Sequence, residues 1–165
     1  MKWIGLRDES ATETMDGSKR LRPHAISVPA LFFDGACQNG IMGCGAWIKL
    51  SSSDRFHISW NAGTGSNTRA ELLALWSGLF VAHNMGIRNI HIYGYSETII
   101  HVINNDSSLL IPIAQGWIRR TKSLWRKLGE PPISHIFREL NTRANGLSKR
   151  GISMDFGSMK IIKYN

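Results

Sequence analysis

The order of short strand patterns and helical patterns along the chain is the feature that most restricts its fold. Three strand patterns come first, at residues 30–33, 44–50 and 55–61. The turn-forming pairs Asn39-Gly40 and Ser53-Asp54 lie between them. Because turns of this kind join antiparallel neighbours, we expect these three strands to form a meander.

The second part of the chain alternates helices and strands. The clearest helix covers residues 68–85, where Leu72, Leu75 and Leu79 recur at helical spacing with Trp76. Weaker patterns predict a strand at 89–93, helices at 96–105 and 112–128, a strand at 133–137 and a helix at 141–150. The order βββαβααβα predicts an α/β fold, a five-stranded mixed sheet with helices on both faces.

A chain of 165 residues is enough for one domain on the usual prior of roughly 150 residues. Residues 1–28 are polar and without periodicity, so we interpret them as a flexible leader; residues 29–152 form the predicted domain, and 153–165 a tail. No apolar segment resembles a secretory signal or a membrane span, which predicts the cytoplasm or nucleus and no membrane partner. Cys37 and Cys44 are too few for a disulfide framework or a zinc site of four cysteines.

Positive charge is concentrated in the last third of the sequence. The chain has a net charge of +8, and nine basic residues face only two acids between residues 119 and 150. A basic patch on a nearly neutral body favours a polyanionic partner, with nucleic acid ahead of membrane. A solvated helix face is the alternative interpretation of such a run.

Four blocks of sequence, in matching order and spacing, resemble the ribonuclease H-like family. The similarity is greatest to its plant, retrotransposon-type branch, the ribonuclease H domain associated with reverse transcriptase. It extends over about residues 30–152. The blocks are Asp34-Gly35-Ala36, Asn67 to Leu75, Ile92 to Ser96 with Ile99-Ile100, and Arg138 to Asn141 with Ala144 to Lys149.

The resemblance implies hydrolysis of the RNA strand of RNA–DNA hybrids by two Mg²⁺ ions, roughly 3.5–4 Å apart, held by four carboxylates. The first two carboxylates are present as Asp34 and Glu71, the expected metal ligands. Tyr95 and Asn145 stand at the third and fourth positions, so the formal charge of the site falls from −4 to −2. Because Mg²⁺ requires anionic oxygen ligands, we expect its binding to be weak or lost and hydrolysis to be lost with it.

Single positions of this pattern also have simpler interpretations. Asp34 alone fits an Asp-Gly turn, and Glu71 alone fits a capping box with Thr68. Glu97 is the nearest acid that might replace a missing ligand, but we expect it to cap the helix that it begins.

The resemblance also implies contacts with nucleic acid. Cys37, Asn39 and Asn67 match positions that contact the RNA backbone and its 2′-hydroxyl groups. The basic residues expected to follow phosphates of the other strand are Arg119, Arg120, Lys122, Arg126 and Lys127, together with Arg138 nearer the site.

Three functional hypotheses follow. The leading one is a degenerate ribonuclease H-like domain, a pseudoenzyme that binds an RNA–DNA hybrid or another RNA-containing duplex. The second is a residual hybrid ribonuclease that uses Asp34, Glu71 and Asn145 with one metal ion. The third is a protein-interaction module whose basic helix, residues 112–128, meets an acidic protein.

Overall fold

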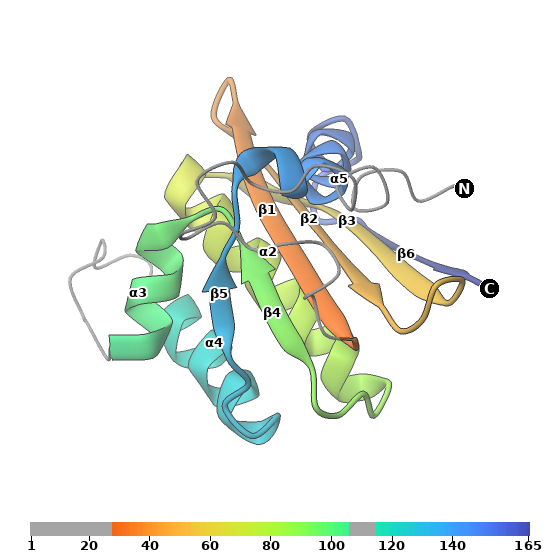
Figure 1. Cartoon of the computed structure of the whole chain (residues 1–165). Helices are drawn as coiled ribbons and strands as arrows, with labels where there is room; N and C mark the ends of the chain where they lie inside the picture. Colours follow the sequence, from red (N-terminus) through yellow and green to blue (C-terminus); the bar gives the residue numbers. More distant parts are fainter. Residues whose placement is uncertain (1–27, 106–114) are drawn as a thin grey trace.

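The computed structural model describes residues 28–105 and 115–165, so the predicted leader falls almost entirely outside the described residues. A six-stranded mixed sheet runs through the domain in the order β5-β4-β1-β2-β3-β6 (Figure 1). β4 and β5 run parallel to β1, and the other pairs are antiparallel. The strands are β1 (Ala30–Gln38), β2 (Ile41–Lys49), β3 (Arg55–Thr64), β4 (His91–Gly94), β5 (Ile133–His135) and β6 (Met159–Tyr164).

Helices cover both faces of the sheet, as the sequence predicts (Figure 1). α2 (Asn67–Asn84), α3 (Glu97–Asn105) and α4 (Gln115–Lys127) share one apolar core with β1 side chains such as Leu31. α5 (Thr142–Ile152) packs on the opposite face, against Phe32 and Trp47, and follows the short 3-10 helix η3 (Arg138–Leu140). Within the described ranges, no helix has the length and apolar character needed to cross a membrane.

The first hairpin confirms the predicted turn. Asn39 and Gly40 connect β1 to β2 with φ angles of 53° and 77°, and Gln38 pairs with Ile41. Positive φ at both central residues is the requirement of the two-residue turn that matches strand twist. β2 and β3 continue antiparallel, so the predicted meander is confirmed.

The expectation of five strands is wrong, because residues 159–164 form a sixth. β6 pairs antiparallel with β3, from Arg55 opposite Tyr164 to Trp60 opposite Met159. Its lysines and isoleucines give no clear alternation, and pairing with β3, nearly a hundred positions earlier, stabilises the strand. β5 is shorter than predicted, since the chain leaves the sheet before η3.

Two glycines let helices approach the sheet where the cleft described below forms. A Cβ atom on Gly35 of β1 would lie 2.3 Å from the backbone carbon of Ala70 in α2. A Cβ atom on Gly45 of β2 would lie 2.3 Å from the backbone nitrogen of Ser148 in α5. Gly45 also pairs with Asp34, so α2 and α5 both come close to the middle of β1.

Candidate active site

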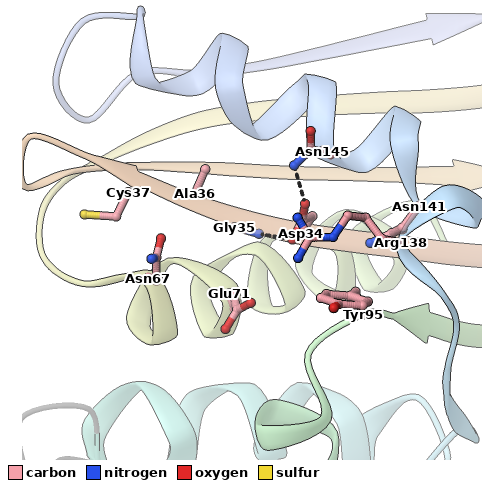
Figure 2. A pocket seen from close by; sticks show the side chains of 10 residues that line it. All are labelled: Asp34, Gly35, Ala36, Cys37, Asn67, Glu71, Tyr95, Arg138, Asn141 and Asn145. Atoms are coloured by element: carbon pink, nitrogen blue, oxygen red, sulfur yellow. Dashed lines mark hydrogen bonds between the residues drawn. The ribbon is translucent and has the colours of Figure 1, made fainter.

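A cleft of about 270 Å³ lies where the second half of β1 and the carboxyl end of β4 meet α2 and α5 (Figure 2). β1 and β4 are parallel, with Phe33 opposite Gly94, so the next residues Asp34 and Tyr95 are neighbours. α2 brings Glu71 and α5 brings Asn145 to the same cleft. The lining residues are Asp34, Gly35, Ala36, Cys37, Asn67, Glu71, Tyr95, Arg138, Asn141 and Asn145.

Asp34 is half-buried at the floor of the cleft, and both of its carboxylate oxygens accept hydrogen bonds. The backbone N–H of Gly35 donates to Oδ1 at 3.0 Å, and the side-chain amide of Asn145 donates to Oδ2 at 2.9 Å. Burial is the largest effect and keeps the pKa of Asp34 above its ordinary value. The Asn145 hydrogen bond and the nearby charge of Arg138 act in the opposite direction. The carboxylate is therefore stabilised by groups of the protein itself.

Glu71 faces the cleft from the second turn of α2. The hydroxyl of Ser96 donates a hydrogen bond to its Oε1 at 3.1 Å and accepts one from the backbone N–H of Ile99 at 3.3 Å. Burial, helped by the negative charge of Asp34 and opposed by the Ser96 hydrogen bond, raises the pKa of Glu71 to about 7. A large fraction of Glu71 is therefore protonated near neutral pH.

The capping-box interpretation of Thr68 and Glu71 is wrong. Ser66 is the N-cap of α2, and its hydroxyl accepts a hydrogen bond from the backbone N–H of Arg69 at 3.2 Å. The N-cap therefore lies two residues before Thr68, and α2 begins at Asn67, which leaves Glu71 beyond the capping positions and directed into the cleft.

Tyr95 lies at the mouth of the cleft with 37% of its surface exposed. The guanidinium carbon of Arg138 lies 4.7 Å from the centre of its ring, and the ring of His135 packs at 5.6 Å. Figure 2 shows the guanidinium beside Asp34 and over Tyr95. A cation–π contact therefore holds a positive group at the position where the resemblance expects a carboxylate and its metal ion.

These residues do not fit a pair of Mg²⁺ ions. In residues 28–105 and 115–165, no three His, Cys, Asp or Glu side chains are grouped so that they could hold a metal ion. Asn145 directs an N–H group at Asp34, and Mg²⁺ binds oxygen lone pairs and not hydrogen donors. Glu97 is exposed in the first turn of α3 and is not one of the lining residues, so it supplies no substitute ligand.

Two residues of the matching sequence blocks support the site, although no role is predicted for them from the sequence. Ser96 connects Glu71 to the start of α3, and a serine between a strand and a helix is a recognisable capping signal. Asn141 is only 2% exposed, and its side-chain amide donates to the carbonyl of Phe33 at 3.0 Å. This bond fixes the start of α5 against the middle of β1, and the sequence carries no signal for it.

The predicted RNA contacts divide into two groups. Cys37 and Asn67 line the cleft, and the thiol of Cys37 donates to the carbonyl of Gly65 at 3.2 Å. Asn39 is exposed at the tip of the β1–β2 turn and is not a lining residue.

The basic residues of α4 form a separate surface, and no residue of this helix lines the cleft. Arg119, Arg120, Arg126 and Lys127 are exposed. Lys122 is only 7% exposed, which contradicts its predicted contact with phosphates, because its place on α4 turns it toward the protein interior.

The mixed sheet, the helices on both faces and the cleft along the second half of β1 define a ribonuclease H-type α/β domain. A family model described as reverse transcriptase-like matches residues 32–151, and the chain belongs to this family. No curated protein sequence matches the chain.

Solved structures agree with this fold. RNase H1 from the halophilic archaeon Halobacterium salinarum NRC-1 is 21% identical with a TM-score of 0.60, over 74% of this chain and 95% of that chain. LC11-RNase H1 in complex with an RNA/DNA hybrid is 20% identical with a TM-score of 0.64, over 74% and 95%. The prototype foamy virus protease–reverse transcriptase is 12% identical with a TM-score of 0.59, over 78% of this chain and 22% of that chain.

Proposed function

We propose that this domain binds an RNA–DNA hybrid or another RNA-containing duplex and does not cleave it. The observation that carries the proposal is the hydrogen bond of 2.9 Å from the Asn145 amide to Asp34. In a two-metal nuclease this pair of residues would present oxygen atoms to a shared ion. Here the amide occupies that direction with an N–H donor.

The charge of the cleft supports the same proposal. Two carboxylates remain, and Glu71, with a pKa of about 7, carries only part of its charge at neutral pH. Arg138 adds a positive charge beside Asp34. Two divalent cations would therefore enter a cleft that is already nearly neutral, which opposes their binding.

Binding of nucleic acid needs fewer features than hydrolysis, and the chain keeps several of them. Asn67 and Cys37 line the cleft, Arg138 is exposed at its mouth, and four basic residues of α4 are exposed. LC11-RNase H1, which has the same fold, was solved with an RNA/DNA hybrid bound. A retained hybrid-binding surface accounts for these residues, and a degenerate catalytic centre accounts for the altered cleft.

A cleavage assay tests the loss of activity. A labelled RNA–DNA hybrid is incubated with the protein in Mg²⁺ and then in Mn²⁺, beside the Asp34→Asn variant. We expect no cleavage above the level of that variant. Cleavage that Asp34→Asn abolishes would instead establish the residual nuclease, with Asp34, Glu71 and Asn145 holding one metal ion.

Calorimetric titration with Mg²⁺ tests the cause. We expect the unsubstituted chain to bind Mg²⁺ weakly or not measurably. The Tyr95→Asp/Asn145→Asp variant regains two carboxylates, so its Mg²⁺ affinity should be at least tenfold above the value, or the detection limit, of the unsubstituted chain. Asn39→Asp adds an acid at the exposed hairpin tip and serves as the matched control. Equal Mg²⁺ affinity in all three proteins would refute the explanation.

A further inference from the structure

The two edges of the sheet differ in the length of strand that they present. β5 forms one edge with three residues, and β6 forms the other with six. An edge strand presents backbone N–H and C=O groups along its outer side, and another strand can pair with them. Within the described residues, β6 is therefore the longer open edge.

The side chains of β6 place an apolar residue between two positive ones. Ile161 is a large apolar residue with 41% of its surface exposed, and Lys160 and Lys163 are both exposed. Ile161 pairs with Ile58 on the α2 face of the sheet, while Ile162 pairs with His57 on the α5 face. A strand that added to β6 would thus meet one isoleucine on each face.

Positive charge also dominates the neighbouring strand on the α5 face. His57, opposite Ile162, experiences the positive charges of Arg55, Arg143 and Arg150, which help to lower its pKa. The acids nearest to β3 and β6 in the sequence are Asp54 and Asp155. Asp54 precedes β3 and Asp155 precedes β6, so they lie at opposite ends of this antiparallel pair. The middle of this edge therefore favours a negatively charged partner.

We propose that β6 is a docking edge for an extended acidic segment of another protein, which pairs with it as a seventh strand. Backbone hydrogen bonds supply affinity in this mode of recognition, and side chains supply specificity. The preferred segment has β-branched apolar residues opposite Ile161 and Ile162 and acids opposite Lys160 and Lys163.

A second copy of the chain fits this edge less well. Pairing of β6 with itself would bring four lysines to one seam between two chains that each carry a net charge of +8. Two strands, β2 and β3, lie between β6 and β1, so β6 is about 14 Å from β1 and the edge is distinct from the cleft. The inference is therefore independent of hybrid binding.

Fluorescence polarisation with a labelled ten-residue peptide centred on Glu-Val-Val-Glu tests the proposal. We expect saturable binding to the full chain and at least tenfold weaker binding to Lys160→Glu/Lys163→Glu. A peptide centred on Lys-Val-Val-Lys should bind at least tenfold more weakly than the acidic one, and a Glu-Pro-Pro-Glu peptide likewise, since proline cannot donate to a strand.

The control variant Arg88→Glu/Lys149→Glu makes the same change of charge away from β6 and should keep the affinity for the acidic peptide. Equal losses in the two double variants would overturn the proposal, because general electrostatics would then explain binding. A dimer in light scattering that Ile161→Lys dissociates would also overturn it, in favour of a second copy. Loss of peptide binding with retained hybrid binding separates this edge from the cleft.

Discussion

At the scale of single residues, the central contact of the cleft is the hydrogen bond from the side-chain amide of Asn145 to the carboxylate of Asp34. An aspartate at position 145 would place its carboxylate beside that of Asp34, and a cation between them would be needed to offset the repulsion. With asparagine, the pair is satisfied by a hydrogen bond of 2.9 Å. Tyr95 acts in the same direction, because its ring holds the Arg138 guanidinium beside Asp34. Both contacts support the proposal that the cleft has lost its metal ions.

His57 gives a prediction about stability at acidic pH. It is 3% exposed, and its ring lies 3.3 Å from an Arg143 nitrogen. Burial, and then the charges of Arg143 and Arg55, lower its pKa from 6.5 to about 3. Below pH 6.5 the imidazole of His57 is protonated in the unfolded chain but not in the folded one. The contribution of neutral His57 to the free energy of unfolding is therefore complete above pH 6.5 and decreases toward pH 3. We expect His57 alone to contribute a loss on the order of 2 kcal/mol between pH 7 and 4.5, measured by urea denaturation as the difference from a variant that lacks this imidazole.

The control for this prediction is His57→Phe, which keeps a ring beside Trp47 and Tyr164 and cannot be protonated. Glu71 shifts stability in the opposite direction, because its raised pKa favours the folded state at low pH and this contribution is lost between pH 4.5 and 7. The difference between the two proteins isolates His57. A difference independent of pH would contradict the prediction.

At the scale of elements, the close approach of α5 to β2 depends on the lack of a side chain at Gly45. An added Cβ atom would lie 2.3 Å from the Ser148 nitrogen and 2.4 Å from the Ala144 carbonyl oxygen. We expect Gly45→Ala to destabilise the fold by about 1–3 kcal/mol, because the helix backbone must move away. The melting temperature measures this effect.

The matched control lies on α5 itself. A Cβ atom on Gly146 would have no atom within 4 Å, so Gly146→Ala should stabilise the helix by about 0.5–1 kcal/mol. If both substitutions changed the melting temperature in the same direction, close helix packing would not be the reason for glycine at position 45.

At the scale of the whole molecule, the net charge of +8 gives a prediction about salt. Four exposed basic residues on α4 correspond to about four phosphate contacts, so log K should fall against log salt with a slope of about −3 to −4. Filter binding at two salt concentrations, with a hybrid and with a DNA duplex, measures it. We expect the hybrid to bind more tightly, because a 2′-hydroxyl distinguishes RNA from DNA.

Reversal of these charges should reduce the slope by about one per residue removed. A binding constant that is insensitive to salt, without preference for the hybrid, would exclude nucleic acid as the partner. It would favour the third hypothesis, an acidic protein that meets α4. The plant retrotransposon-type branch and the cytoplasmic or nuclear location stay predictions.

The amino-acid sequence by itself determined the local features of this protein. The Asn39-Gly40 turn and the long helix α2 depend on residues near each other in the chain. The sequence also states directly which side chains stand at positions 34, 71, 95 and 145. The turn and the helical periodicity predicted the order of the elements and so the fold class, because both depend on neighbouring residues. The residues that gather in the cleft were predicted from the resemblance to the ribonuclease H-like family.

Only the tertiary structure decided the features that depend on distant pairs. β6 exists because it pairs with β3, Lys122 is buried because α4 packs on α2, and Asn145 donates to Asp34 across 111 positions of sequence. Residues that far apart carry no shared periodicity or turn signal. Their contacts follow from the packing of complete elements, which also determines the direction of an amide hydrogen.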